Sequence, residues 1–582
     1  MTPRYVRHLG ALCLVSGLMV GCTSSPPTSP TPKGSEGGAA PQATSAAIQV
    51  PQSIQPAQSS PAAPGAASPA PKTGSPVAAP AATTSAAPSG ARVEPQGQVV
   101  YAWHTSLSPA WVDPDENQAV ITPFGIQYAL HDAMVKPLPG KPFEPSLAES
   151  YEIAPDFRSA TFKLRPNLTF HDGSPITSED VKFTYEKYKG VNARILHDKL
   201  DRIETPDDRT TRFLFKEPFL DFLNIYGTPA SGAAWIIPKR YYEQVGGDGF
   251  KQQPIGAGPY KMVGSTSGNE FRFEAFTDYW RKTPSVKTLI IRGVAEDATR
   301  VAQLQTGEAD LINLVPGALL GIVQSDPNLR LAPVRAGNFW MAFRDMDKPD
   351  NPFSNAKVRE AVYLAIDRQA IADAEEGGQS LLTRNWIASD WPGALPDVKP
   401  EYDPARAKQF MAEAGYADGF DVEQLTPLPP YFSIGERVIT QLREIGIRTK
   451  LNTMERGAFL SRLAEGPNAL KGIILHGSAA PGDAASRIRA FATCNGSNTL
   501  MCVPEIDAKF AQYEQSTDPR ERERLLTEIQ QTILDNNYQI SIYRQAFINA
   551  VGPRIANEWS EIFGAAPQYI YVGPYEDIRL KE

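Results

Sequence analysis

The side chains that most often carry out catalysis are present, but few of them stand at spacings typical of an enzyme. The histidines are scattered, and none belongs to the His-Glu-x-x-His pattern that binds zinc. The sequence also lacks a Gly-x-x-x-x-Gly-Lys-Ser/Thr phosphate loop and a Gly-x-Ser-x-Gly nucleophile turn. We therefore expect neither a metal site nor a cofactor. The six histidines are His8, His104, His131, His171, His197 and His476.

One short motif could supply a nucleophile. Ser354 and Lys357 fit the Ser-x-x-Lys pattern of penicillin-binding proteins. The neighbouring residues favour a different interpretation, in which Ser354 caps a helix and Lys357 faces solvent. A glycosidase with paired carboxylates stays open, because such pairs leave no local spacing signature. We expect the protein not to be an enzyme.

Two of the four cysteines, Cys494 and Cys502, lie close together in a polar stretch. In an oxidising compartment this spacing predicts a disulfide, and two free thiols are the alternative. A loop of this size would stabilise the fold by about 2.5 kcal/mol in the chain-entropy model.

The amino terminus has the features of an export signal. Arg4 and Arg7 precede an apolar run, Leu9–Gly21, which is too short to span a bilayer as a helix. The run ends in Leu-Met-Val-Gly before Cys22, which resembles a bacterial lipobox. A lipid on Cys22 would hold the protein at a membrane surface, in the periplasm or cell envelope. Ordinary cleavage near Gly21, leaving Cys22 free, is the alternative.

The next segment, residues 23–97, consists almost entirely of Pro, Ala, Ser, Thr, Gly and Gln and has no aromatic residue. It cannot bury enough apolar surface to fold, so we expect a disordered tether with a span of roughly 50 Å. A spacer without a specific role predicts the same disorder. The whole sequence has a formal charge of −8, and its first 97 residues are positively charged overall. Residues 98–582 would therefore carry a formal charge of −11. This acidic balance argues against a nucleic-acid partner.

The folded part reads as a mixed α/β chain of two or three lobes. Residues 160–165 alternate like a strand, and a helix follows in which Thr177 or Ser178 is the cap and Asp180 lies in the first turn. The glycines of Gly256–Tyr260 suit a tight turn against a neighbouring backbone, and His171 would orient another turn. Further helices are expected to start at Ser354, Asp403-Pro404 and Asp518-Pro519, and strands at 287–291 and 539–543.

Taken in order, these segments resemble the extracellular solute-binding proteins of family 5, the dipeptide-, oligopeptide- and nickel-binding proteins of ABC importers. The resemblance covers nearly all of residues 98–582, and the order and spacing of its motifs are more specific than any single one. The motifs are Leu147–Ile153, Thr161–Pro166, Phe170–Phe183, Gly256–Tyr260, Tyr279–Trp280, Arg300–Asp310, Pro352–Val362, Ala365–Arg368, Tyr402–Pro404 and Ala414–Tyr416.

The resemblance implies a two-lobed periplasmic-binding-protein fold with an extra subdomain on the first lobe and a ligand cleft between the lobes. Lobe I would comprise residues 98–342 and 543–582, and lobe II residues 343–542. It further implies a monomer that passes a peptide or another small polar solute to a membrane permease and its ATPase. A surface-tethered receptor or sensor of the same fold, not coupled to transport, is the alternative.

The ligand itself is harder to predict. Peptide-binding relatives carry a Trp-x-Ala-Asp-Tyr stretch whose Asp pairs with the peptide's amino group, and an ungapped match places Gly477 and Ala480 at its Trp and Asp positions. Asp483 could substitute only if the loop shifts, and His476 lies in the same stretch. Arg487 and Arg489 follow, and guanidinium groups favour anions, so an anionic non-peptide ligand stays open. A solvated helix face is the alternative for both arginines.

Aromatic side chains are the remaining candidates for the cleft, because concave sites favour aromatic walls with a few polar groups. Each of them could instead belong to the hydrophobic core. The candidates are Tyr101, Trp103 and His104 at the end of the first expected strand, Trp340 at the crossing between lobes, and Trp386 and Trp391 in the loop before Pro392.

Overall fold

The computed structural model of the protein describes residues 94–116, 121–138, 141–190, 192–227, 232–466, 469–479, 482–563, 570 and 573–582. The expected signal, Cys22, most of the tether and Ala480 lie outside these residues. All the elements described below belong to the compact unit Pro80–Glu582.

The main sheet of the described residues has nine strands, and β12 and β17 are its longest. They pair antiparallel, and every residue of β17 is buried, which is why its sequence is apolar over most of its length. The strands are, in spatial order, β14 (Leu425–Pro427), β16 (Ile473–Ser478), β12 (Arg330–Phe343), β17 (Gln539–Val551), β11 (Leu311–Ile312), β1 (Gln96–Trp103), β10 (Val286–Gly293), β9 (Glu270–Ala275) and β8 (Tyr260–Thr266).

A second, antiparallel sheet of four strands packs its apolar face against short helices. Its order is β4 (Ala148–Ile153), β5 (Ser159–Leu164), β7 (Thr210–Phe215) and β6 (Leu200–Asp207). Two strand pairs complete the set, β2 (Val135–Leu138) with β3 (Lys141–Pro145) and β13 (Phe420–Asp421) with β15 (Ile447–Arg448).

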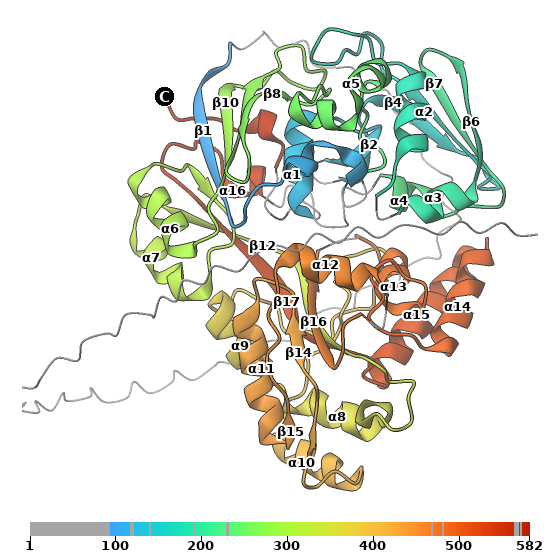
Figure 1. Ribbon diagram of the computed structural model, residues 1–582, viewed down its shortest axis with the longest axis vertical. Coiled ribbons are helices and arrows are strands. Elements are labelled where there is room, and N and C mark those ends of the chain that lie inside the picture. Colours follow the sequence, from blue (N-terminus) through green and yellow to red (C-terminus); the bar gives the residue numbers. More distant parts are fainter. Residues whose placement is uncertain are drawn as a thin grey trace, which may run out of the picture. The chain divides into compact units, whose positions relative to one another are not determined.

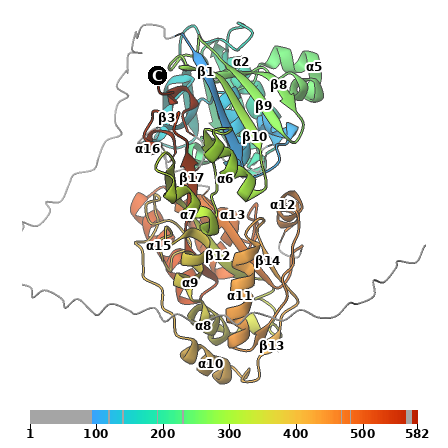
Figure 2. The same ribbon diagram turned by 90° about the vertical axis from the view of Figure 1, so that its left-hand side faces the viewer.

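The buried apolar residues form separate cores, and these define two lobes. The first lobe packs around a large core with Val99 and Phe213 among its members and around a smaller one that includes Val301. The second lobe packs around two cores, one containing Phe339 and the other Trp340. Figures 1 and 2 show β12 and β17 running between the elements of the two lobes. The chain therefore has the two-lobed fold expected from the sequence.

Helices cover both lobes. Those of the first lobe are α1 (Ile121–Leu130), α2 (Ser178–Lys187), α3 (Ala193–Lys199), α4 (Phe222–Tyr226), α5 (Lys239–Gln252), α6 (Asp297–Thr306), α7 (Leu320–Ser325) and α16 (Trp559–Ile562). Those of the second are α8 (Ala356–Ala365), α9 (Arg368–Glu376), α10 (Pro404–Glu413), α11 (Phe432–Glu444), α12 (Arg456–Ala464), α13 (Ala484–Ala492), α14 (Pro504–Gln515) and α15 (Pro519–Asp535).

The pairing of β12 with β17 is irregular where these strands pass from the core of one lobe to the core of the other. The register between β12 and β17 shifts between Arg335 and Gly337 and again between Phe339 and Trp340. A side chain on Gly337 would approach the Phe547 ring to 2.9 Å, so the two strands are closely packed at this point. The lobe limits predicted from the sequence, with crossings at 342 and 543, stay a prediction.

Most helix starts follow the local sequence. Thr177 caps α2 in a capping box with Asp180, and Asp403 and Asp518 cap α10 and α15, each followed by proline. The prediction that Ser354 opens a helix is wrong. Ser354 ends a short 3-10 turn, and the side chain of Asn355 accepts the hydrogen bond from Lys357 N that caps α8.

The glycine-rich turn after α5 lies against the backbone that ends α1. A Cβ atom on Gly256 would lie 1.9 Å from the carbonyl oxygen of Leu130, and one on Gly258 would lie 2.6 Å from that of Ala129. His171 contacts the same turn, with Nε2 3.0 Å from the Gly258 carbonyl oxygen. The close backbone approach is confirmed, whereas His171, which the sequence predicts to orient its own turn, has its ring against this one.

Candidate ligand-binding site

Two neighbouring strands of the second lobe hold the first pair of candidate residues. The register of β12 and β16 places Trp340 opposite His476, and their ring centroids lie 5.0 Å apart. Successive residues of a strand face opposite sides of the sheet, so Phe339 and Met341 enter one core while Trp340 enters the other. Both Trp340 and His476 are buried.

Helix α13 brings a cation and a third ring to the same face. Asp483 caps its start by accepting a hydrogen bond from Ser486 N at 2.9 Å. Arg487 and Phe491 stand four residues apart and therefore share one side of the helix. The guanidinium carbon of Arg487 lies 4.8 Å from the centroid of the Trp340 ring, and Phe491 lies 5.3 Å from that ring.

The loop between α9 and α10 supplies two more tryptophans. The ring of Trp386 lies 5.9 Å from that of Trp340, and the guanidinium of Arg487 lies 4.7 Å from the ring of Trp391. A hydrogen bond from Ala484 N to the Pro392 carbonyl oxygen ties the loop to the start of α13. We call Trp340, Trp386, Trp391, His476, Arg487 and Phe491 the aromatic–arginine cluster.

The cluster holds a buried charge. Arg487 is fully buried, and its Nη2 atom donates to the Ser478 carbonyl oxygen at 2.8 Å. Burial lowers its pKa to about 9, although Asp483 acts in the opposite direction. Burial, helped by the charges of Arg487, Arg456 and Arg344, lowers the pKa of His476 to about 3, so this ring is neutral at pH 7.

Several nitrogens of the cluster are unpartnered. Buried polar atoms are nearly always hydrogen-bonded, so these nitrogens are donors that acceptor atoms of a ligand can satisfy. Among the residues that the structure describes, the buried nitrogens without a hydrogen-bond partner include Nε1 of Trp340, Trp386 and Trp391, Nδ1 of His476, and Nε and Nη1 of Arg487.

A residue of the first lobe shares its electrostatic surroundings with the cluster. The charge of Arg456, on α12, lowers the pKa of both His104 and His476. Burial is the larger cause for His104, whose pKa falls to about 3, and its ring also contacts the Asn313 side chain at 3.3 Å. The charge of Arg456 therefore acts on one candidate residue of each lobe.

Tyr101 and Trp103 lie elsewhere. They are two residues apart on β1, face the same side of the sheet and are fully buried in the first core. Tyr101 lies 5.7 Å from Trp103 and 5.9 Å from Phe563, ring centroid to ring centroid. The structure does not place them in the aromatic–arginine cluster.

The alternative that Arg487 and Arg489 form a solvated helix face is wrong. Arg487 is buried in the cluster, and Arg489 Nη2 lies 2.7 Å from an oxygen of Asp221 and 3.1 Å from one of Glu514. Arg489 is only partly buried, but these ion pairs engage its guanidinium.

Asp221 joins the two lobes. It precedes α4, whose Phe222 belongs to the first core, whereas its partners lie on α13, α14 and α15 of the second lobe. Burial by itself raises the pKa of Asp221, but the charges of Arg489 and Arg522 outweigh it and the net pKa is lowered. We call Asp221, Arg489, Tyr513 and Arg522 the Asp221 cluster. Its distances to Asp221 oxygens are 2.7 Å from Arg489, 2.7 Å from Arg522 and 3.2 Å from Tyr513.

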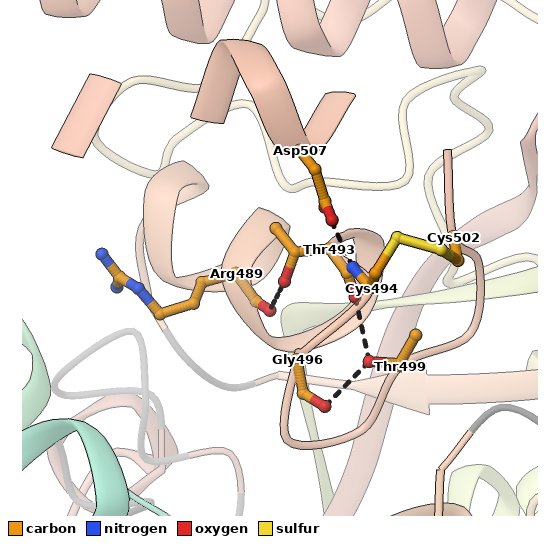
Figure 3. The surroundings of a disulfide bond; sticks show 7 residues. All are labelled: Arg489, Thr493, Cys494, Gly496, Thr499, Cys502 and Asp507. Atoms are coloured by element: carbon orange, nitrogen blue, oxygen red, sulfur yellow. Dashed lines mark hydrogen bonds between the residues drawn. A yellow bond between two sulfur atoms is a disulfide. The ribbon is translucent and has the colours of Figure 1, made fainter. Parts of the chain in front are cut away.

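The loop after α13 is closed by a disulfide between Cys494 and Cys502 (Figure 3), as the spacing predicts. Cys494 N donates to Asp507 on α14 at 2.9 Å, and Thr499 Oγ1 donates to the Thr493 and Gly496 carbonyl oxygens. The loop therefore fixes α14 against the end of the helix that carries Arg487.

The remaining catalytic motif is not assembled as a nucleophile. Ser354 Oγ donates to the Pro349 carbonyl oxygen, and Lys357 forms an ion pair with Glu413 at 2.9 Å. Within the described ranges no group of three or more His, Cys, Asp or Glu side chains is arranged to hold a metal ion.

Sequence reasoning missed Arg456, Phe491 and Asp221. Phe491 had a usable signal, because it follows Arg487 by one helical turn. Arg456 and Asp221 have no such signal in the sequence, because each contacts its neighbours only through the tertiary fold. Asp221, for example, is separated from Arg489 by 268 positions.

Comparisons with known proteins agree with this fold. Residues 142–499 match the model of the bacterial extracellular solute-binding proteins, family 5. The glutathione-binding protein GsiB of Salmonella typhi is 27% identical over 432 residues, which cover 71% of this chain and 83% of that protein.

Two solved structures show the same architecture. The binding protein DppA from Helicobacter pylori, in complex with the peptide STSA, has a TM-score of 0.70 at 22% identity and covers 84% of this chain and 98% of its own. AgaA from A. tumefaciens R10, in complex with agropinic acid, has a TM-score of 0.69 at 23% identity and covers 84% and 99%. Because the family model matches more than half of the sequence, the chain belongs to the bacterial extracellular solute-binding proteins of family 5.

Proposed function

We propose that this protein, the solute-binding component of an ABC importer, captures one small polar solute at the aromatic–arginine cluster and presents it to a membrane permease. The family is one of solute-binding proteins and not of enzymes. The observation that carries the site is the set of six nitrogens, on five buried side chains of the cluster, that have no hydrogen-bond partner in the described part of the chain. Hydrogen-bond donors inside an aromatic wall suit a small polar ligand.

Two observations bear on the chemical class of the ligand. The glutathione-binding relatives favour a peptide or a peptide-like compound, whereas the presence of Gly477 where peptide-binding relatives carry Trp favours another polar solute. The likeness to the peptide-bound and agropinic-acid-bound structures cannot choose between them, because it concerns the fold alone. A ligand that combines carboxylate and polar groups satisfies both considerations.

The place of the protein in the cell follows from the family and from the amino terminus. Family members are extracytoplasmic, and no helix in the described part of this chain is long and apolar enough to cross a membrane. We propose that a lipid on Cys22 anchors the protein and that residues 23–97 let a monomer of the binding domain reach its permease. The alternative of a tethered receptor without transport is an outcome of the test below.

Native mass spectrometry of the protein purified from its host tests this function. We expect one co-purified compound of small mass, whose removal lowers Tm and whose return restores it. Uptake of that compound should stop in a strain that lacks the protein. Turnover of the compound by the purified protein, without ligand-dependent stabilisation, would contradict the proposal. Binding with unchanged uptake would favour the receptor.

A further inference from the structure

We propose that Arg487 binds a carboxylate of the solute while the rings of Trp340 and Trp391 flank its guanidinium. This inference rests on the proposed function, because it assigns a ligand class to the same site. It concerns the chemistry that the cluster recognises, and it separates acidic solutes from their neutral analogues.

The first argument is that the charge of Arg487 has no carboxylate partner among the residues that the structure describes. A buried ion normally persists only when it is paired and fully hydrogen-bonded. Arg487 has one acceptor, the Ser478 carbonyl oxygen, and its Nε and Nη1 atoms have none among the described residues. Asp483, the acid that acts on its charge, has an oxygen engaged by Ser486 N at the cap of α13.

Arg300, which is buried as deeply as Arg487, shows how a structural arginine is hydrogen-bonded. Arg300, on α6, is 1% exposed, and its Nε, Nη1 and Nη2 atoms all donate to protein acceptors. Its Nη2 atom also lies 2.6 Å from Asp297. Arg300 has the contacts of a structural arginine, and Arg487 lacks them.

The surroundings of Arg487 favour a carboxylate over a more highly charged anion. The guanidinium presents a planar set of donors that matches two carboxylate oxygens. His476 is neutral, and Arg489 is paired with Asp221 and Glu514, so neither of these two neighbours adds a free positive charge beside Arg487. The nearby Asp483 would repel a dianion such as phosphate, so one negative charge fits best.

The aromatic rings explain how one carboxylate could be held tightly. Trp340 and Trp391 lie 4.8 Å and 4.7 Å from the guanidinium carbon, a distance that permits cation–π attraction. They also exclude water, which strengthens an ionic hydrogen bond. The indole Nε1 atoms of both rings add donors that an acidic or polar solute can use.

Matched pairs of acid and neutral analogue test the inference. The probes are trialanine and trialanine amide, and glutathione and glutathione diethyl ester, where the neutral analogue is the one whose carboxyl groups are all blocked. Calorimetric titration would use wild-type protein and the Arg487→Met and Arg487→Lys variants, all refolded from denaturant to remove co-purified solute. We expect the wild type to bind at least one acid roughly 100-fold more tightly than its analogue. Arg487→Met should lose that preference, and Arg487→Lys should keep part of it.

The thermal stability of the ligand-free variants tests the inference independently of the probes. Removing an unpaired buried charge should leave the ligand-free Arg487→Met variant at least as stable as the wild type, with Tm equal or higher by a few degrees. The control, Arg300→Met, should lower Tm, because its acceptors would lose their donors.

The outcomes separate the two proposals. Binding of a neutral analogue as tightly as its acid by the wild type would overturn the carboxylate inference and leave the proposed function standing. A ligand-free Arg487→Met variant less stable than the wild type would also overturn it, since Arg487 would then be structural. Failure of the wild type to bind any small compound, including those from its host, would count against the proposed function itself.

Discussion

Burial has opposite consequences for two arginines that stand two positions apart on α13. Arg489 is balanced by Asp221 and Glu514, and its pKa is raised, because the attraction of Asp221 and Glu514 outweighs the effect of burial. Arg487 faces aromatic rings and its pKa falls to about 9, because burial dominates there. Arg489 thus binds the other lobe, whereas Arg487 keeps hydrogen-bond donors for a solute.

One buried carboxyl should make its own contribution to how stability depends on pH. Burial raises the pKa of Glu376, at the end of α9, from 4.5 to about 8, despite hydrogen bonds from Ser380 and from Ala546 N. The folded protein then holds a proton that the unfolded chain has lost, so the free energy of unfolding should fall between pH 4.5 and 8. The slope from this group is at most about 1.4 kcal/mol per pH unit.

The Glu376→Gln variant should remove that decline. Urea unfolding at several pH values would measure it, with Glu523→Gln on the exposed face of α15 as the control. We expect the Gln variant to gain stability relative to the wild type as pH rises from 5 to 8. An unchanged pH profile would mean that Glu376 is ionised in the fold at neutral pH.

At the scale of elements, the turn that contains Gly256 depends on the absence of a side chain. A Cβ atom there would overlap the Leu130 carbonyl, which is backbone and cannot move aside as a side chain would. We expect Gly256→Ala to lower the free energy of unfolding by at least about 3 kcal/mol. Gly264→Ala, on β8, is the control, because nothing lies within 4 Å of its added atom. Equal urea midpoints for the two variants would contradict this account.

The disulfide loop is a second element with a measurable contribution. Replacing both Cys494 and Cys502 by serine should lower stability by about 2.5 kcal/mol, because the unfolded chain gains the freedom that the bridge removes. Urea unfolding of the double variant beside the wild type under non-reducing conditions would measure the loss. Reduction of the wild type should reproduce it, and a variant as stable as the wild type would show that the bridge does not constrain the chain.

Local elements were predictable where a few neighbouring residues decide them. The starts at Thr177, Asp403 and Asp518 follow from capping side chains and prolines in the sequence itself. The prediction that Ser354 starts a helix failed because a 3-10 turn ends at Ser354 and Asn355 becomes the cap of α8. The spacing of apolar residues does not reveal such a turn. For the site, the sequence indicated most members of the aromatic–arginine cluster by type, but it could not give the burial of Arg487 or the position of Arg456.

At the scale of the whole molecule, the Asp221 cluster is a charged contact that joins the two lobes. Asp221→Asn would leave Arg489 and Arg522 close together without their shared carboxylate, which is costly only while the lobes are closed. We expect solute affinity to fall by about tenfold, because the binding-competent state becomes less populated. Titration of the host-derived compound would measure the affinity.

The ligand-free protein should respond differently to the same change. If the cluster acts through closure, Tm without solute should stay nearly constant in Asp221→Asn. Glu217→Gln, which removes an exposed ion pair with Lys199 in the first lobe, is the control and should leave affinity unchanged. A large loss of Tm at constant affinity would show instead that the cluster stabilises one fold and not the closed state.

The two strands that run through both lobes have a thermodynamic consequence. β12 and β17 each contribute residues to the cores of both lobes, so neither lobe can lose its core without fraying the sheet of the other. Such sharing couples the two unfolding equilibria. Differential scanning calorimetry should therefore record one endotherm, with a van't Hoff enthalpy close to the calorimetric one, for a binding domain that changes shape as two bodies but melts as one.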